Sequence, residues 1–465
     1  MAKGMSDAFL RHTSDKRVKV GRNVAMKKMI ISLTAFIYVI IPVTNVDASV
    51  IYTVKENDSL WKISEKYDSS QDTLQDINGV QDPSQLLPGQ SLVIPGEEYI
   101  IDPGDSLWKV ANLHQTSIEQ LKKVNNLSSE IVHPGQRLKI PQGSKRHINT
   151  GAFFIPSTPA ENKSAINFYQ EYLNRIGFFE YRPDQNGDLS SLRGEEAITQ
   201  AWENGMTPYA TITNLSAAGF NPELAHTLLA DPDKQQTLIE NAATLVDQKQ
   251  YKGIIIDFEN LQSGDRSHFN SFIKQLNQRL EKIGGEVGIA LPPMQGEREP
   301  AHQAAYDYQT LGTHSDFLFL MTYDWHWPGG EAGSIAPISK VDETIQYAVS
   351  VIPSEKIYLG LAMYAYDWTT STEQGEAQAY SQQRALNIAA EKSSKIHYNF
   401  ERATPWFEYY DDTGHLHEVW FEDARSLIPK YNLVKKYDLK GIGGWKTGLR
   451  FPQAGYLLKE KFHLN

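Results

Sequence analysis

The chain has 465 residues, a net charge of −11 and no cysteine. The lack of cysteine excludes disulfides, thiol catalysis and thiolate metal sites, and the length is enough for two or three domains. A hydrophobic content of 40% and an aromatic content of 11% are typical of a globular protein. The acidic balance argues against nucleic acid as a partner, because phosphates are bound by basic surfaces.

The first 48 residues differ from the rest of the chain in charge. They carry eight lysines and arginines against three aspartates. Lys27 and Lys28 precede an apolar run at 29–43, and Ala48 ends a small-residue sequence suited to cleavage. The run is short for a membrane span. We therefore expect residues 1–48 to be a basic leader with a signal peptide, so that the protein is exported and contacts the membrane only through this segment. A retained membrane anchor and an ordinary core helix are the alternatives.

Two similar segments follow the leader. The sequence Asp-Ser-Leu-Trp-Lys-Ile at 58–63 recurs as Asp-Ser-Leu-Trp-Lys-Val at 105–110, and the segment 87–95 recurs at 133–141. Each segment predicts a strand, two helices and a second strand, and the Asp-Ser pair suits the cap of the first helix. The expected strands are 51–54, 91–94, 99–101 and 137–140, and the expected second helices are 73–77 and 117–124.

The two segments resemble LysM modules, at residues 50–96 and 98–142. Each opens with Tyr-x-Val/Ile-x-x-x-Asp-Ser-Leu-Trp and closes with Pro-Gly-Gln-x-Leu-x-Ile-Pro. The resemblance implies binding of glycans that contain N-acetylglucosamine, either peptidoglycan or chitin, in a shallow groove between the first helix and the loops. We expect the tryptophans of the repeated motif, Trp61 and Trp108, to be core residues and the loops to contact the sugar. The modules would then tether the rest of the chain to an insoluble polymer.

After a short polar linker at 143–150, apolar strands alternate with amphipathic helices. Eight strand-and-helix units predict a (β/α)8 barrel at 148–465, and a doubly wound α/β sheet is the alternative. The expected strands are 148–155, 178–181, 207–212, 253–258, 287–291, 317–321, 356–361 and 441–445. The expected helices include 164–175, 232–248, 268–283, 341–352 and 424–437.

An insertion is expected after the seventh barrel strand, at about 366–422. Its aromatic run at 404–410, the turn at 412–414 and the segment 417–421 are typical of a β-hairpin. The predicted fold class is therefore α/β: a TIM barrel with a small α+β insertion, preceded by two βααβ modules.

Two carboxylates end the fourth strand of the predicted barrel. Side chains alternate along a strand, so Asp257 and Glu259 share one face, while Ile256 and Phe258 point the other way into packing. Two acids on one face repel each other, and this repulsion keeps one of them protonated near neutral pH, as general acid and base catalysis requires. A strand end that reaches solvent is the structural alternative.

Other strand ends carry aromatic and acidic residues as well. In such barrels the residues at the carboxyl ends of the strands carry the chemistry. Tyrosine and tryptophan supply stacking planes and hydrogen-bonding tips, so their convergence with acids predicts a glycan site. The residues concerned are Met321, Tyr323, Asp324 and Trp325 after the sixth strand, Tyr364 after the seventh, and Trp445 at the end of the eighth.

The barrel region is similar to glycoside hydrolase family 18. The family's fourth-strand motif is Asp-Gly-x-x-x-Asp-x-Glu, which Gly253, Asp257 and Glu259 match. The chain departs from the family at Lys252, where an aspartate is usual, and at Ile255, where an aspartate or asparagine is usual. In relatives the acid at position 255 influences the protonation of the next acid along the strand, so this departure implies slower activity or a shifted pH range.

Two further motifs extend the resemblance. The sixth-strand motif Met-x-Tyr-Asp matches at 321–324, and the final Gly-x-x-x-Trp matches at 441–445. The order of two LysM modules before the barrel and the late segment 419–424 are most similar to spore-associated N-acetylglucosaminidases of endospore-forming bacteria, which act on spore-cortex peptidoglycan. This implies a glycosidase of the cell wall or spore envelope that cleaves β-1,4 bonds after N-acetylglucosamine. A weak or silent glycan-binding spore or cell-wall protein, and a chitinase, are the alternatives.

In this family the substrate's own 2-acetamido oxygen attacks the anomeric carbon, an exception to the usual scheme of two carboxylates. The resemblance implies that Glu259 is the proton donor, that Asp257 orients the acetamido N–H, that Tyr323 hydrogen-bonds the acetamido carbonyl and that Asp324 holds the distorted sugar. It implies no cofactor and no metal, and the histidines show no metal-ligand spacing. The residues expected to bind substrate are Trp445, Met321, Trp325 and Tyr364.

Overall fold

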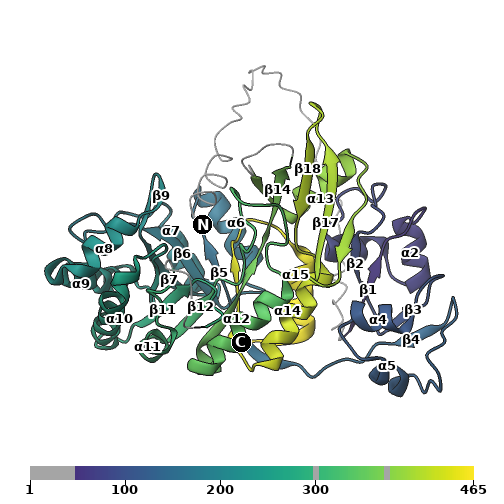
Figure 1. The fold of residues 1–465 in the computed structure, drawn as a ribbon, viewed down its shortest axis with the longest axis horizontal. Coiled ribbons are helices and arrows are strands. Elements are labelled where there is room, and N and C mark those ends of the chain that lie inside the picture. Colours follow the sequence, from purple (N-terminus) through teal and green to yellow (C-terminus); the bar gives the residue numbers. More distant parts are fainter. Residues whose placement is uncertain (1–47, 297–302, 371–376) are drawn as a thin grey trace, which may run out of the picture.

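The computed structural model describes residues 48–296, 303–370 and 377–465. The predicted leader and signal peptide lie outside these residues, apart from Ala48. Two small modules lie beside a barrel, and an insertion rises from one end of that barrel (Figure 1). Within the part of the chain described, no helix is both long and apolar enough to span a membrane.

Each module has the predicted strand, two helices and second strand. The first consists of β1 (Ser49–Thr53), α2 (Leu60–Tyr67), α3 (Gln71–Asn78) and β2 (Ser91–Pro95), and the second of β3 (Glu98–Ile100), α4 (Leu107–Leu113), α5 (Ile118–Val124) and β4 (Arg137–Lys139). In both, the two strands pair antiparallel.

Local hydrogen bonds explain where the first helices begin. The hydroxyl of Ser59 accepts a bond from the N–H of Lys62, and Ser106 caps its own helix in the same way. The carboxylate of Asp58 accepts bonds from the hydroxyl of Tyr52 at 2.7 Å and from the N–H of Lys55 at 2.8 Å. The repeated Asp-Ser pair therefore caps the helix with its serine and ties the preceding strand to the helix with its aspartate.

The prediction that Trp61 and Trp108 are core residues is wrong. Their side chains are 57% and 53% exposed. In α2 the buried positions are Leu60, Ile63 and Ser64, which form one stripe of a 3.6-residue helix. Trp61 lies about 100° round the helix from Leu60, so it points to solvent when that stripe packs on the sheet.

The remainder of the chain forms a closed barrel, as predicted. Eight parallel strands follow each other in chain order, and the last pairs with the first to close the sheet. A short final strand, β20 (Phe462–Leu464), pairs with the start of the first barrel strand. The barrel strands are β5 (Arg146–Phe154), β6 (Arg175–Tyr181), β7 (Thr207–Thr213), β10 (Gly253–Asp257), β11 (Glu286–Leu291), β12 (Phe317–Leu320), β13 (Ile357–Ala362) and β19 (Gly441–Trp445).

Helices surround the barrel between its strands (Figure 1). They are α6 (Pro159–Tyr169), α7 (Glu196–Glu203), α8 (Pro222–Ala230), α9 (Pro232–Lys249), α10 (Arg266–Glu281), α11 (Tyr308–Thr313), α12 (Ile338–Val351), α14 (Ala424–Lys436) and α15 (Pro452–Lys461). A small hairpin of β8 (Leu215–Ser216) and β9 (Gly219–Phe220) precedes α8.

The first barrel helix differs from its predicted bounds, 164–175. Helix α6 begins earlier because Thr158 and Glu161 form a capping box around its first turn, with Pro159 at the start. Arg175, predicted as the helix end, is the first residue of β6. Its guanidinium pairs with Glu286 of β11 at 3.1 Å, a contact across the barrel that the local sequence pattern does not reveal.

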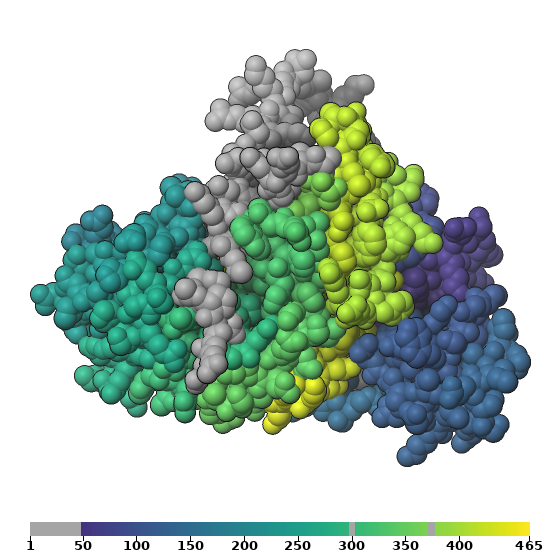
Figure 2. Space-filling model, viewed as in Figure 1, coloured from purple at the N-terminus to yellow at the C-terminus, as the bar shows by residue number. Residues whose placement is uncertain are grey.

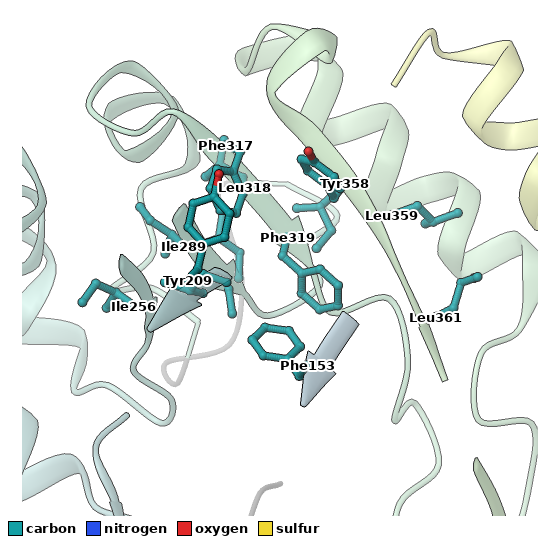
Figure 3. Packing of buried hydrophobic residues seen from close by; sticks show 14 of the residues in the cluster. Phe153, Tyr209, Ile256, Ile289, Phe317, Leu318, Phe319, Tyr358, Leu359 and Leu361 are labelled. Carbon is teal, nitrogen blue, oxygen red and sulfur yellow. The ribbon is translucent and has the colours of Figure 1, made fainter. Parts of the chain in front are cut away.

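The barrel interior is filled by aromatic rings (Figure 3). Phe153 of β5 meets Phe319 of β12 edge to face, with 5.1 Å between ring centroids. Nearer the amino ends of the strands, the guanidinium of Arg175 lies among the rings of Tyr209, Phe317 and Tyr358. The barrel is thus a packed core, and the chemistry is left to its carboxyl end.

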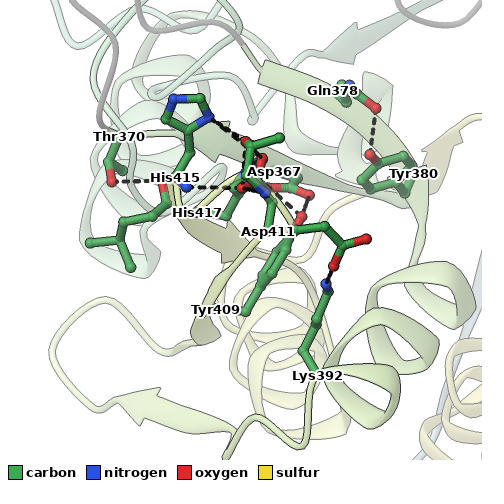
Figure 4. Close-up of polar contacts among 12 residues, drawn as sticks. Asp367, Thr370, Gln378, Tyr380, Lys392, Tyr409, Asp411, His415 and His417 are labelled. Carbon is green, nitrogen blue, oxygen red and sulfur yellow. Dashed lines mark hydrogen bonds and ion pairs between the residues drawn. The ribbon is translucent and has the colours of Figure 1, made fainter.

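The insertion forms its own five-stranded sheet after β13. Its elements are β14 (Tyr364–Thr369), β15 (Ala377–Ser381), α13 (Gln382–Glu391), β16 (His397–Asn399), β17 (Thr404–Tyr410) and β18 (Leu416–Trp420), and β17 and β18 are the predicted hairpin. Buried Asp367 of β14 accepts bonds from the hydroxyl of Tyr409 at 2.7 Å and from Nδ1 of His417 at 2.8 Å (Figure 4). A single aspartate therefore ties β14 to both strands of the hairpin.

The first module packs directly on the barrel. The side-chain amide of Gln453 on α15 donates to Asn78 Oδ1 and to the carbonyl of Ser91, both at 2.9 Å. The hydroxyl of Ser49 also donates to Glu460 at the other end of α15. These groups are buried, so buried hydrogen bonds join the first module to the barrel, although the second module separates the two in the chain.

The same module also touches the insertion. The N–H of Ile396 donates to the carbonyl of Pro88 at 2.9 Å, and a Cβ added at Gly89 would lie 1.8 Å from the carbonyl oxygen of Ile396. Gly89 has φ +87°, so glycine alone allows both this turn and this approach. In Figure 2 the purple and blue modules lie against the yellow-green insertion.

Replacing Asn78 with alanine should destabilise the whole protein more than the matched change at Asn125. Both asparagines bond to the N–H and the carbonyl of a strand residue in their own module, Val93 or Lys139. Only Asn78 also accepts from Gln453, so Asn78→Ala leaves additional buried groups unpaired, at a cost of about 1–3 kcal/mol each. Calorimetric melting of both variants checks this, and equal decreases in Tm would contradict it.

Candidate active site

Three acids lie at the carboxyl end of the barrel. Asp257 is the last residue of β10, Glu259 follows two residues later, and Asp324 comes shortly after β12. Phe258 stacks on Phe272 of α10, with 6.0 Å between ring centroids. As the strand alternation predicts, Phe258 packs outward against the helices, and its two acidic neighbours point the other way.

Two side chains hold the segment that carries Glu259. Buried Asn214, which follows β7, accepts a bond from the N–H of Glu259 at 2.9 Å and donates to its carbonyl at 2.8 Å. The hydroxyl of Tyr306 donates to the carbonyl of Phe258 at 2.8 Å. The backbone on both sides of the second acid is therefore clamped, which restricts the position of its side chain.

Burial and mutual repulsion keep these acids protonated at higher pH than usual. Burial, followed by the negative charge of Glu180, raises the pKa of Asp257 to about 7. Burial, followed by the charges of Asp257 and Asp324, raises the pKa of Glu259 well above its usual range. Burial also raises the pKa of Asp324 to about 7. Acids with such pKa values suit proton transfer near neutral pH.

Two tyrosines of β14 hold Asp324. Its Oδ1 accepts bonds from the hydroxyls of Tyr364 at 2.5 Å and Tyr366 at 3.1 Å, and these bonds oppose the rise in its pKa. The backbone of Asp324 has φ +62°, a conformation that aspartate tolerates better than most residues. Tyr364, which is expected to bind substrate, has a fully buried side chain whose hydroxyl donates to Asp324. Its contact with substrate stays a prediction.

The other predicted site residues come from the same end of the barrel. Tyr323 is buried, and the negative charges of Asp324, Asp257 and Glu259 act on its hydroxyl after the effect of burial, so that its pKa rises. Trp445, at the end of β19, is partly buried and lies against Phe179 of β6, with 4.8 Å between centroids. Two more predicted residues, Met321 and Trp325, are partly buried after β12.

Sequence reasoning missed four residues of this site. Asn214, Tyr306 and Tyr366 are polar side chains that hold the acids in place, and the polar position after a buried strand was a usable signal only for Asn214. Glu180 lies inside an aromatic stretch of β6, and its charge acts on Asp257. No spacing in the sequence relates it to an acid that lies 77 positions away.

An apolar hollow beside the barrel is separate from the acids. A cavity with about 660 Å³ of empty volume lies between the barrel wall and the helices α6 and α15, with Tyr169, Met363 and Leu458 among its lining residues and none of the three acids. Within residues 48–296, 303–370 and 377–465, no group of three or more His, Asp or Glu side chains is arranged as a metal site. The arrangement of acids and hydroxyls can donate, accept and hold protons.

Replacing Asp257 with asparagine should make the protein relatively more stable as the pH rises. Its pKa is about 7 in the folded protein and ordinarily 3.8. Below about pH 4 both states hold the proton. Between about pH 4 and 7 only the folded state keeps it, so the wild type loses stability across this window. The difference should reach on the order of a few kcal/mol by pH 8, since one pKa unit corresponds to ~1.4 kcal/mol.

Urea unfolding of Asp257→Asn and the wild type at pH 4, 6 and 8 measures this difference. The matched control is Asp76→Asn on α3, where the aspartate is exposed and the change should have an effect that varies little with pH. A constant difference between Asp257→Asn and the wild type would contradict the raised pKa.

Comparisons with known proteins find relatives of both the barrel and the two modules. The model of glycosyl hydrolases family 18 matches residues 201–449, and the LysM domain model matches 52–95 and 99–141.

The putative sporulation-specific glycosylase YdhD of Bacillus subtilis is 36% identical over 415 residues, 89% of this chain and 98% of that protein. The cortical fragment-lytic enzyme of Bacillus anthracis is 36% identical over 421 residues, with the same coverage. The crystal structure of the Bacillus cereus spore cortex-lytic enzyme SleL matches with a TM-score of 0.82 at 34% identity, over 90% of this chain and 99% of that one. The chain therefore belongs to glycosyl hydrolases family 18 and carries two LysM domains ahead of its barrel.

Proposed function

We propose that the protein is a glycosidase that cleaves β-1,4 bonds after N-acetylglucosamine in peptidoglycan of the spore cortex or its fragments. The observation that carries this proposal is the clamped pair of acids, Asp257 and Glu259, with raised pKa values beside the Tyr323 hydroxyl. The names of two relatives, a cortical fragment-lytic enzyme and a spore cortex-lytic enzyme, support the choice of peptidoglycan over chitin. The predicted leader supports export to the cell wall or spore envelope.

The reaction would proceed with help from the substrate. The 2-acetamido oxygen attacks the anomeric carbon, and Glu259 protonates the leaving glycosidic oxygen as the bond breaks, which leaves an oxazolinium intermediate. A water then attacks the same carbon while Glu259 takes up its proton, which reopens the ring. The raised pKa of Glu259 suits the first step, because the acid must be protonated when it meets the substrate.

The neighbouring groups would stabilise that intermediate. Asp257 would accept a bond from the acetamido N–H, where positive charge develops, and Tyr323 would donate to the acetamido carbonyl. Asp324, held by its two tyrosine hydroxyls, would hold the distorted sugar over the indole of Trp445. Such contacts favour the bent, charged intermediate over the relaxed sugar, which is how binding energy accelerates a reaction.

Replacing Glu259 with glutamine should lower turnover by roughly 10²–10⁴-fold, because the amide has no proton to transfer. The assay is release of reducing ends from purified cortex peptidoglycan, with product masses, and binding of the glycan should survive. The matched control is Glu281→Gln at the exposed end of α10, which should keep full activity.

Proton NMR of the first product should show a retained anomeric configuration, since two displacements occur. Near-normal turnover of Glu259→Gln, or an inverted product, would overturn the mechanism.

We also propose that the LysM modules hold the enzyme on its insoluble substrate. Trp61 and Trp108 occupy equivalent places in α2 and α4, and both rings are open to solvent. The ring of Trp108 lies next to the exposed ring of Phe400 in the insertion, with 5.8 Å between ring centroids. Flat exposed rings suit the apolar faces of sugars, and linked binding modules raise the effective concentration of the catalytic domain on the polymer.

Replacing Trp61 with alanine should reduce co-sedimentation with intact peptidoglycan while hydrolysis of short soluble fragments stays unchanged. The change removes an exposed ring, so we expect little loss of stability. Trp202→Ala is the control, because Trp202 is an exposed tryptophan on α7 of the barrel. If Trp61→Ala sediments as well as the wild type, this ring does not contribute to anchoring.

A further inference from the structure

Strand β6 contains an extra residue close to the active site. Phe179 and Tyr181 pair with consecutive residues of β7, so Glu180 between them is left over, as in a β-bulge. The rings of Phe178 and Tyr181 both pack against the ring of Tyr251, which precedes β10. The distances between ring centroids are 5.8 Å for Phe178 and 6.1 Å for Tyr181. Residues three apart lie on opposite faces of a regular strand. The bulge therefore places Phe178 and Tyr181 on one face of β6. Phe179 and Glu180 lie on the opposite face.

That other face is the barrel interior. Phe179 lies there against Trp445, which places its neighbour Glu180 at the same end of the barrel as the catalytic acids. The Glu180 side chain is only 11% exposed. Its charge is the second cause, after burial, of the raised pKa of Asp257.

The carboxylates of Glu180 and Asp257 each have a buried oxygen that no described hydrogen-bond donor contacts. Within the described residues, Oε2 of Glu180 and Oδ1 of Asp257 are buried and accept no hydrogen bond. The guanidinium of Arg182 forms an ion pair with Oε1 of Glu180 and leaves Oε2 free of it. Ile255, two residues before Asp257 on the same face, offers no polar group.

The neighbouring charges favour one distribution of the proton. Burial raises the pKa of Glu180, and its bond and ion pair with Arg182 oppose that rise. Asp257 has no such cation among the groups that act on it, and Glu259 is subject to the charges of two acids, Asp257 and Asp324. Of two acids in a low-dielectric site, the one paired with a cation ionises first. Glu180 is then the ionised member, and Asp257 is the protonated one.

We propose that Glu180 is a further carboxylate of the active site, a positioning residue that, held by Arg182, keeps the proton on Asp257 until substrate binds. This rests on the proposed function, in which Asp257 must accept a bond from the acetamido N–H. Asp257 gives up its proton more easily when the Glu180 charge is absent. The enzyme without that charge should therefore work at lower pH.

Glu180→Gln tests this through the pH profile, because the amide keeps the shape and an acceptor for Arg182. The acidic limb of kcat/KM on soluble peptidoglycan fragments should move to lower pH by about one unit or more. Adding Ile255→Asp to that variant puts a carboxylate beside Asp257 again, so the limb should return toward the wild-type pH. Glu171→Gln, which breaks an exposed Glu171–Lys459 ion pair elsewhere, is the control and should leave the profile unchanged.

A second measurement does not depend on activity. Urea unfolding of the wild type, Asp257→Asn, Glu180→Gln and the double variant forms a cycle at pH 5 and pH 8. At pH 8 the stabilisation caused by Asp257→Asn should shrink in the Glu180→Gln background, and at pH 5 it should be smaller than at pH 8 and similar in both backgrounds. An unshifted acidic limb, or no coupling at pH 8, overturns the role of Glu180. If the wild type hydrolysed no glycan, the proposed function would fail, and the unfolding cycle would still decide on Glu180.

Discussion

The burial of three neighbouring carboxylates at one end of a barrel is the constraint on which the rest of this structure depends. Asp257, Glu259 and Asp324 would each be more stable ionised in water, and burial raises the pKa of all three. Free side chains would turn toward solvent to relieve that cost. The barrel prevents this by clamping the backbone around Glu259 through Asn214 and Tyr306 and by holding Asp324 with two hydroxyls of the insertion.

The two ends of the barrel treat charge in opposite ways. At the amino end of the strands, Arg175 faces Glu286 and the hydroxyl of Tyr209, so the buried charges are paired. Such pairing satisfies the groups and leaves them no proton to exchange near neutral pH. At the carboxyl end Arg182 pairs with Glu180, while Asp257, Glu259 and Asp324 form no ion pair among the described residues and have raised pKa values. The unpaired excess is what makes this end reactive, at the expense of stability.

The insertion and the first LysM module are structural parts of the enzyme. The insertion supplies both tyrosines that hold Asp324, so its sheet and the barrel must keep their relative positions for the site to exist. The first module is bonded to α15 through Gln453 and to the insertion through the Pro88 carbonyl. A glycan held by the modules would therefore be held at a defined place relative to the acids.

Much of the fold and part of the site could be predicted from local patterns. The period of two in β10 places Asp257 and Glu259 together, and the repeated Asp-Ser pair marks the first helix of each module. The prediction for Trp61 is wrong because Leu60 and Ile63 already form the buried stripe of α2, and Trp61 lies outside that stripe. The predicted bounds of α6 are wrong at their carboxyl end because Arg175 begins β6, where it pairs with Glu286 on the other side of the barrel.

What the sequence by itself determined is therefore the alternation of strands and helices, the module repeats and the acids that follow directly on a strand end. These depend on residues within a few positions of each other, whose geometry follows from the period of the element. Only the tertiary structure decided that the hydroxyl of Tyr364 donates to Asp324 and that Asn214 clamps Glu259. It also decided that a bulge leaves Glu180 unpaired with β7, at the end of the barrel where its charge acts on Asp257. Each of these contacts joins segments that are far apart in the chain, and closing the barrel is what brings them within reach of one another.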